Sequence, residues 1–152
     1  MVDKKNLIQG APLWPFGDAS LMHKVRRAGQ RLSSSWAATV TTGLSSVQYA
    51  SLVVLAELGT CDQQTLGNRA GFDRATGSYL VERMVERGLI HAVTDPANRR
   101  SKLISLTDVG REVLEATIPE AKRAEAMLAE RLSADELKQL KKLMNALLDL
   151  DN

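Results

Sequence analysis

The side chains best suited to binding chemistry lie in one short stretch, HAVTDPANRRSKLISLT, from His91 to Thr107. A turn-forming cluster, DPAN, separates two runs rich in apolar and β-branched residues, and Arg99 and Arg100 follow it directly. This pattern predicts a β-hairpin with LIHAVT and KLISLT as strands and residues 95–101 as the connection. Guanidinium groups at a hairpin tip suit a negatively charged surface such as the minor groove of DNA.

A second polar surface is expected just before the hairpin. The sequence predicts two short helices in tandem, opened by Asp62 and Asp73, whose carboxylates can accept the first free N–H groups. Gly71 and Gly88 stand where glycines end helices. The second helix is expected to bury Leu80, Val81, Met84 and Val85. Its first turn is polar and therefore free to contact a ligand.

This order of elements predicts a winged helix-turn-helix, in which the second helix enters the major groove of DNA and the hairpin reaches the minor groove. The alternative for the polar helix residues is an ordinary solvated face. Because successive residues of a strand point to opposite sides, only one of Arg99 and Arg100 is expected to enter the groove. The predicted DNA contacts are Arg74, Thr76, Ser78, Tyr79, Arg99 and Arg100, and weaker candidates for phosphate contact are Gln63, Gln64, Thr65 and Arg69.

Further helices must carry this module. Asp18 is the predicted N-cap of a helix that runs to about Thr41, and an almost entirely apolar helix over residues 46–58 is expected at the centre. Thr107 is the predicted cap of a long helix that extends to about Arg131, and Pro119 predicts a kink or a break inside it. The expected fold is mainly α with a small β-hairpin wing.

The last helix has the strongest local signal, because Ser133 and Glu136 form a capping box. It can pack onto its own domain or pair with a second copy, and we favour a homodimer. We expect an N-terminal arm and first dimerisation helix (1–45), a DNA-binding lobe (46–108) and C-terminal dimerisation helices (109–152) in one intertwined structural domain. Its narrow apolar stripe consists of Leu137, Leu140, Met144, Leu147 and Leu150.

Composition limits the remaining possibilities. A chain of 152 residues with 44% apolar and 25% charged residues predicts one packed domain. Since neither a signal peptide nor an apolar run of about 18 residues is present, we expect a cytoplasmic protein without a membrane partner. One cysteine and two histidines predict no disulfide, metal site or other cofactor. No catalytic motif is recognisable, so we do not expect an enzyme.

The chain resembles the MarR family of bacterial transcriptional regulators. The resemblance lies in LSSVQYASLVVLAELG, TLGNRAGFDRATGSYLVERMVERGLI, DPANRRSKLISLTDVGREV and LSADELKQLKKLM, and it covers residues 44–150 well. It implies a homodimer of winged-helix protomers on a pseudo-palindromic operator, with repression usually relieved by a small molecule. It also implies that Arg100 is the arginine of the minor groove.

Three residues depart from the family pattern. Asn98 replaces a common Asp, which would leave the wing arginine with at best a neutral hydrogen bond. Gly77 replaces a branched apolar residue, which either permits close approach of a neighbour or is merely tolerated. Tyr79 replaces a residue that is often basic, and it either changes base preference or packs against the sugar-phosphate backbone.

The signal that such a regulator senses is a separate question. Arginine binds carboxylates and aromatic rings stack, so one hypothesis is a small aromatic or nitrogen-heterocyclic carboxylate as effector. The alternatives are solvated and core side chains with no such site, oxidation of Cys61, a regulator without any input, and a winged helix that binds protein. The predicted effector-binding residues are Trp14, His23, Arg26, Arg27, Trp36 and Tyr49.

Overall fold

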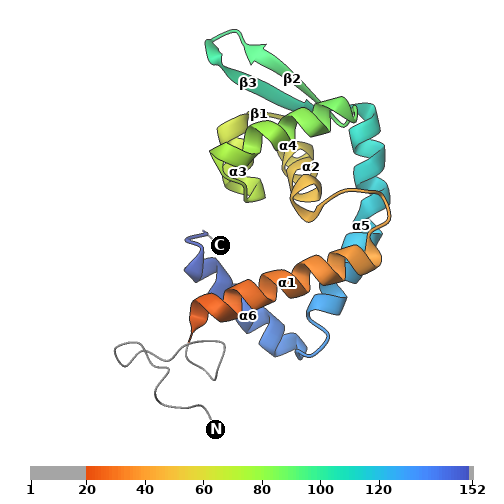
Figure 1. The fold of residues 1–152 in the computed structure, drawn as a ribbon, viewed down its shortest axis with the longest axis vertical. Helices are drawn as coiled ribbons and strands as arrows, with labels where there is room; N and C mark the ends of the chain where they lie inside the picture. The colour runs from red at the N-terminus through yellow and green to blue at the C-terminus, as the bar shows by residue number, and fades with distance from the viewer. Residues whose placement is uncertain (1–19, 151–152) are drawn as a thin grey trace, which may run out of the picture.

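The computed structural model describes residues 20–150 and has the predicted fold, mainly α with a small antiparallel sheet. Figure 1 shows helix α5 as a spine between a winged lobe at one end and helices α1 and α6 at the other. The elements are α1 (Leu21–Thr39), α2 (Ser46–Leu58), β1 (Thr60–Asp62), α3 (Gln63–Ala70), α4 (Arg74–Glu86), β2 (Ile90–Asp95), β3 (Asn98–Leu106), α5 (Asp108–Leu128) and α6 (Ala134–Leu147).

Most helix starts follow the predicted capping residues. The carboxylates of Asp62 and Asp73 accept the backbone N–H groups of Thr65 and Thr76, at 2.7 and 2.8 Å. The hydroxyl of Thr107 caps α5 in the same way, and the Ser133–Glu136 capping box is confirmed. These side chains satisfy backbone donors that a helix leaves unpaired in its first turn.

Helix α1 begins later than predicted. Its N-cap is Ser20, whose hydroxyl accepts the backbone N–H of His23 at 3.2 Å, so the assignment of the cap to Asp18 was wrong. The helix ends at Thr39 instead of about Thr41. Serine and aspartate are about equally good caps, so the choice between them depends on where the chain first turns, which composition does not determine.

The core lies in the winged lobe. Helix α2 is buried at its centre, with Leu52 and Leu55 almost without exposed surface, as its uniform apolarity predicted. Val85 was wrongly expected to be buried and is 41% exposed, because only the Gly77–Val81–Met84 side of α4 faces the core. The buried apolar cluster comprises Leu44, Leu52, Val54, Leu55, Cys61, Leu66, Val81, Met84, Leu89, Ile90, Ile104 and Leu114.

The sheet is larger than the predicted hairpin. A third strand, β1, pairs antiparallel with β3, which gives the strand order β1-β3-β2. Strand β3 begins at Asn98, so Arg99 and Arg100 belong to this strand. Their assignment to a connection over residues 95–101 was therefore wrong. Thr94 pairs with Lys102 but Asp95 pairs with Asn98, which leaves residues 99–101 as a bulge without opposing partners. Such bulges re-aim side chains at the edge of a sheet.

Helix α5 is continuous through Pro119 and ends at Leu128, short of the predicted Arg131. The break that was one of the two predicted effects of Pro119 is therefore absent. Next to Pro119, Glu120 is hydrogen-bonded to the connection between α1 and α2. Thr41 donates from its backbone N–H and its hydroxyl to the carboxylate of Glu120, at 2.9 and 2.6 Å. These bonds lower the pKa of Glu120, with the side-chain bond as the larger cause.

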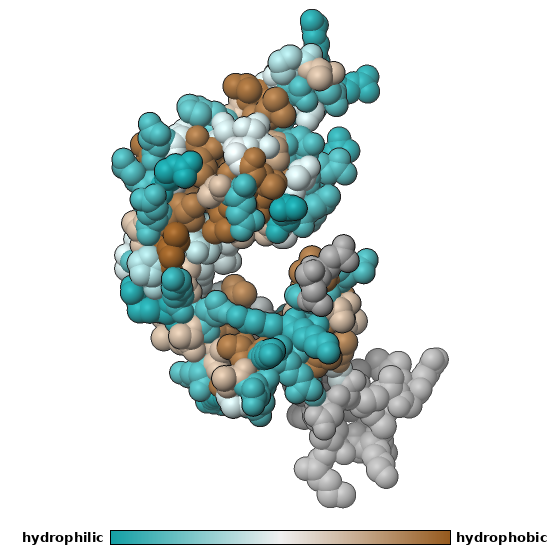
Figure 2. Space-filling view, turned by 180° about the vertical axis from the view of Figure 1, so that it is seen from behind, coloured by the Kyte–Doolittle hydropathy of each residue, from teal (hydrophilic) through white to brown (hydrophobic). Residues whose placement is uncertain are grey.

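Helix α1 packs along α5, and Arg31 in the middle of α1 contacts the C-terminal end of α5. Arg31 donates to the carbonyl of Leu128 at 3.2 Å and forms an ion pair with Glu130 at 2.7 Å. Helix α6 is different, because none of its residues 134–147 is buried. Its Lys141 forms an ion pair with Glu125 of α5 at 2.6 Å. Figure 2 shows, from the other side, the hollow between the winged lobe and the α1–α6 end.

Candidate functional site

A polar groove of about 580 Å³ separates helices α3 and α4 from strand β3. It brings together Arg74 and Ser78 of α4 with Arg100 and Lys102 of β3, although these pairs are far apart in the sequence. Helix α4 and the β2–β3 hairpin lie at the end of the molecule opposite α1 and α6 (Figure 1). The groove thus joins the predicted recognition helix to the wing, with cationic side chains on both.

The first turn of α4 is fixed by its own cap. The carboxylate of Asp73 accepts both the backbone N–H and the hydroxyl of Thr76, the latter at 2.9 Å. These two bonds, with the backbone bond as the larger cause, lower the pKa of Asp73. Because the hydroxyl proton of Thr76 is held by Asp73, Thr76 can offer DNA only an acceptor. It does not line the groove.

The angle between α3 and α4 depends on two glycines. The ring of Phe72 lies between them, so that a β-carbon added at Gly67 or Gly77 would be 3.0 or 2.8 Å from Phe72 Cε2. Gly77 therefore permits close approach of a neighbour, which is one of the two predicted explanations for it. Nearby, Gln63 of α3 donates to the hydroxyl of Ser78 at 3.4 Å and so links the two helices.

The wing tip is held by side-chain bonds to its own backbone. Asp95 accepts the backbone N–H of Ala97 at 2.8 Å, and Asn98 accepts that of Arg100 at 3.1 Å. Asn98 therefore supports the peptide of Arg100 and not its guanidinium, which differs from the role considered for it. Arg100 lines the protein groove between α4 and β3, and Arg99 does not.

The predicted contact residues are only partly collected in this groove. Arg74, Ser78 and Arg100 line it, with Gln63 and Gln64, whereas Thr76, Tyr79, Arg99, Thr65 and Arg69 do not. Sequence reasoning missed Lys102 and Glu82, which also line it. Consecutive residues Arg100, Ser101 and Lys102 all line the groove, so the bulged strand does not follow the period of two from which Lys102 could have been found. Tyr79 lies on the surface of α4 with 69% of its area exposed.

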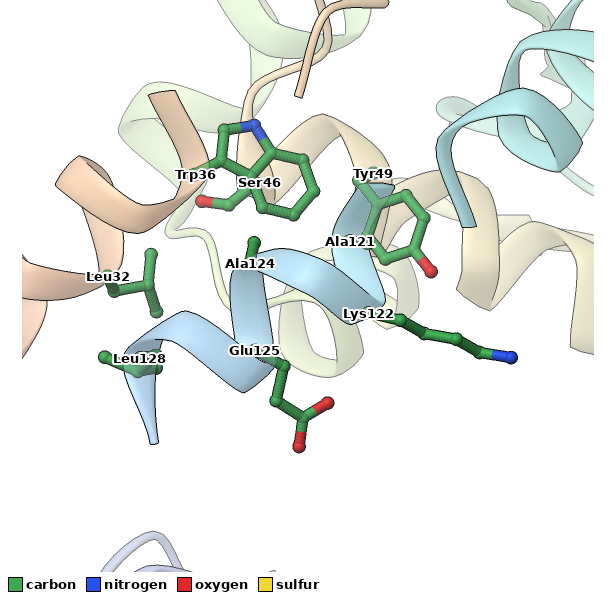
Figure 3. A pocket seen from close by; sticks show the side chains of 9 residues that line it. All are labelled: Leu32, Trp36, Ser46, Tyr49, Ala121, Lys122, Ala124, Glu125 and Leu128. Atoms are coloured by element: carbon green, nitrogen blue, oxygen red, sulfur yellow. The ribbon is translucent and has the colours of Figure 1, made fainter. Parts of the chain in front are cut away.

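A second pocket, of about 280 Å³, lies where α1, α2 and α5 meet. The rings of Trp36 and Tyr49 face it with centroids 5.4 Å apart and planes tilted by 50° (Figure 3). The indole N–H of Trp36 donates to the carbonyl of Leu44 at 2.7 Å. Burial, and to a lesser extent Glu125, raise the pKa of Tyr49, so its hydroxyl stays protonated at neutral pH. The full lining is Leu32, Trp36, Ser46, Tyr49, Ala121, Lys122, Ala124, Glu125 and Leu128.

Only two of the predicted effector residues reach this pocket. Trp36 and Tyr49 line it, whereas His23, Arg26 and Arg27 lie nearer the start of α1 and do not. A nitrogen of Arg26 is 2.9 Å from Nδ1 of His23, and the pKa of His23 is lowered by desolvation and by both arginines. Trp14 lies outside the described residues. Lys122 and Glu125, which sequence reasoning missed, are the charged residues of the pocket.

Cys61 has the surroundings of a structural thiol. It is buried in β1, where it pairs with Ile104 of β3. Burial and the neighbouring charge of Asp62 raise its pKa, against a smaller opposing effect of Arg69. Oxidation needs a thiol that is accessible and deprotonated. Burial opposes access to Cys61, and its raised pKa opposes deprotonation. Within residues 20–150, no group of three potential metal ligands lies together, and no helix is long and apolar enough to cross a membrane.

The helix-turn-helix, the wing and the cationic groove between them define a winged-helix DNA-binding protein. The MarR family model matches residues 42–101. The transcriptional repressor NicR of Pseudomonas putida is 30% identical over 130 residues, which span 85% of this chain and 82% of NicR. The chain belongs to the MarR family and is a transcriptional regulator.

Two solved structures extend the comparison. PcaV of Streptomyces coelicolor, in complex with its natural ligand, is 32% identical, with a TM-score of 0.81 over 90% of this chain and 98% of PcaV. BpsR of Bordetella bronchiseptica, whose DNA binding is regulated by 6-hydroxynicotinic acid, is 28% identical, with a TM-score of 0.81 over 91% of this chain and all of BpsR.

Proposed function

We propose that this regulator is a homodimeric repressor that binds a pseudo-palindromic operator and is released by a small aromatic or nitrogen-heterocyclic acid. The observation that carries the proposal is the groove in which Arg74 of the recognition helix faces Arg100 and Lys102 of the wing. Cations on both sides of such a groove suit the phosphates that flank a major groove and the negative potential of the adjoining minor groove.

Exposed apolar surface supports the homodimer. Leu140, Leu143 and Leu147 of α6 are 44–59% exposed, and Leu21 and Met22 of α1 are 63% and 84% exposed. Burying such side chains is favourable, at roughly 25 cal/mol per Å² of apolar area. In this proposal residues 1–45 and 109–152 form the dimer and residues 46–108 bind DNA. A two-fold axis would place two recognition helices about one helical turn of DNA apart.

The pocket between α1, α2 and α5 supports an aromatic effector. Its volume is larger than the cavity of about 150 Å³ that holds benzene in an engineered protein. Trp36 and Tyr49 offer ring surfaces, the Tyr49 hydroxyl offers a donor, and Lys122 offers a cation for a carboxylate. The action of 6-hydroxynicotinic acid on BpsR supports the nitrogen-heterocyclic acid as the class to test first.

A short chain of contacts connects this pocket to the recognition helix. Trp36 donates to the carbonyl of Leu44, and the preceding carbonyl, that of Gly43, accepts a hydrogen bond from Arg87 at 3.1 Å. Arg87 is the C-cap residue of α4. An effector that displaces Trp36 would therefore move the peptide that holds the end of α4, which is the coupling between sites that release from DNA requires.

Fluorescence anisotropy tests the proposed operator binding. The duplexes come from the DNA upstream of the protein's own gene, and binding is measured over a series of salt concentrations. We expect binding tighter than to random duplexes, and Arg100→Ala should weaken it and reduce the slope of log affinity against log salt by about one. Arg99→Ala is the matched control and should have the smaller effect. Equal losses from both variants would contradict the role of Arg100.

The same complex then tests the effector. We expect 6-hydroxynicotinic acid to release the DNA, and 2-hydroxypyridine, which lacks the carboxylate, to release it much less. Lys122→Met should weaken the effect of the acid without changing DNA affinity in its absence. Binding of the acid without any change in DNA affinity would contradict the proposed regulation.

A further inference from the structure

The outward face of the recognition helix has an unusual composition. Helix α4 buries Gly77, Val81 and Met84, which follow one another at intervals of four and three residues. The face that points most directly away from the core carries Ala75, Tyr79, Glu82 and Glu86 at the same spacing, and all four are exposed. Arg83 borders this face on the side opposite Glu82, and its charge is paired with Glu86. The part of the helix that would point at the bases therefore carries no unpaired cation.

The other polar side chains of this helix are already engaged. Thr76 bonds to Asp73, Ser78 accepts a hydrogen bond from Gln63, and Arg83 forms an ion pair with Glu86 at 2.7 Å. Within residues 20–150, no side-chain hydrogen bond or ion pair involves Tyr79 or Glu82. Both side chains are therefore available to a ligand that approaches the outward face.

Glu82 is the informative residue, because it lines a groove together with Arg74, Arg100 and Lys102 and pairs with none of them. A carboxylate at a DNA-binding surface weakens the attraction to phosphates. One use for a carboxylate at such a surface is to read a base. In the major groove a carboxylate can accept the N4 amino group of cytosine, whereas the edges of guanine and the carbonyl edge of thymine present acceptors that repel it.

Tyr79 offers complementary chemistry one turn earlier. Its ring and the methyl group of Ala75, four residues earlier on α4, are both exposed, and apolar groups of this kind contact the C5-methyl group of thymine. Tyr79 and Glu82 are three residues apart, which is about 4.5 Å along the helix axis. That distance is close to the step of about 3.4 Å between bases on one strand. The two side chains can therefore meet neighbouring base pairs.

We propose that Tyr79 and Glu82 set the base preference of each half-site, with Tyr79 against a thymine methyl group and Glu82 accepting from the cytosine of an adjoining base pair. This inference rests on the proposed operator binding. The arginines and Lys102 supply attraction that is independent of sequence, and Glu82 rejects the bases whose edges it repels.

Selection from a library of random duplexes tests this without knowledge of the operator or the effector. The wild type should enrich a half-site with adjacent thymine and cytosine, and a change of either base should weaken binding about fivefold or more. Glu82→Gln should shift the preference at the cytosine position towards adenine, because an amide pairs with the N6 and N7 groups of adenine. Tyr79→Ala should lose the thymine preference, and Tyr79→Phe should keep it.

Glu86→Gln is the control for charge on the same helix, since it removes a carboxylate and also releases Arg83 from its ion pair. Both changes act on all duplexes alike. It should raise affinity for all duplexes and leave the selected sequence unchanged. If Glu82→Gln does no more than Glu86→Gln, the readout role of Glu82 is wrong and its carboxylate only repels phosphates. If the wild type selects no sequence at all, the proposed operator binding itself fails, which is a distinct result.

Discussion

The ring of Phe72 lies so close to the backbone of Gly77 that a β-carbon at Gly77 would be 2.8 Å from Phe72 Cε2. This contact joins the turn of the helix-turn-helix to the second turn of the recognition helix. It explains why a glycine replaces the branched apolar residue common in the family. The α3–α4 geometry, which orients the residues proposed to contact DNA, thus depends on the absence of a side chain at position 77.

Gly77→Val should therefore destabilise the protein. Overpacking of this kind costs roughly 1–3 kcal/mol, which urea unfolding would measure as a lower free energy of unfolding. Phe72→Leu should recover part of that loss in the double variant, because the smaller side chain vacates the space. Additive effects of the two substitutions would show that Phe72 is not what excludes a side chain at position 77.

Asp73 should make stability depend on pH in the acid range. Its pKa is lowered from the ordinary 3.8 in the folded state, so its contribution is fully present above that value and is lost as pH falls through the lowered value. Asp73→Asn keeps a good N-cap without a titrating group. The stability advantage of the wild type over Asp73→Asn should thus shrink as pH falls, in urea unfolding at several pH values. Glu57→Gln, on the exposed side of α2, controls for net charge.

Arg87 should affect DNA binding without touching DNA. Arg87→Met removes the hydrogen bonds to the carbonyl of Gly43 and the side chain of Gln48, and so frees the end of α4 from the α1–α2 connection. We expect affinity to fall on the order of threefold to tenfold, the scale of one hydrogen bond. The slope of log affinity against log salt should stay the same, unlike that of Arg100→Ala. A reduced slope would mean that Arg87 contacts phosphate directly.

Helix α6 should be required for assembly. Leu147→Glu places a charge on a side chain that is 52% exposed in the single chain, and we expect it to shift the protein from dimer to monomer in sedimentation velocity. Val93→Glu is the control, because Val93 is 58% exposed but lies on the wing. A wild-type monomer, or a dimer unaffected by Leu147→Glu, would contradict the proposed interface.

Cys61 should be slow to react in the folded protein. Its raised pKa keeps the thiol protonated at neutral pH, and its burial excludes reagents. Alkylation by iodoacetamide should be much faster in urea than in buffer, as mass spectrometry would record. Peroxide should change the DNA affinity of the wild type no more than that of Cys61→Ala. Loss of DNA binding in the wild type alone would restore the redox hypothesis.

Local signals along the chain predicted much of this fold. The caps Asp62, Asp73, Thr107 and Ser133 were confirmed, because a capping side chain bonds to a backbone group only two or three residues away. The hairpin was predicted for a similar reason, since DPAN favours a turn between runs of strand-forming residues. The Asp18 cap failed because several residues in that segment could begin a helix.

Contacts between distant parts of the chain were decided by the tertiary structure. Strand β1 is three residues long and pairs with β3, which lies more than 40 residues later. Its extended conformation depends on that pairing, so no local sequence pattern predicts it. Lys102 and Glu82 meet across a groove because the bulged strand packs beside α4, and Lys122 joins Trp36 because α1 packs along α5. The sequence by itself determined the order of the helices and the hairpin, and the capped starts of α3, α4, α5 and α6, through short-range hydrogen bonds. Which side chains share a site was decided by the packing of the lobe against the α5 spine, since that packing brings together residues whose separation in sequence gives no local signal.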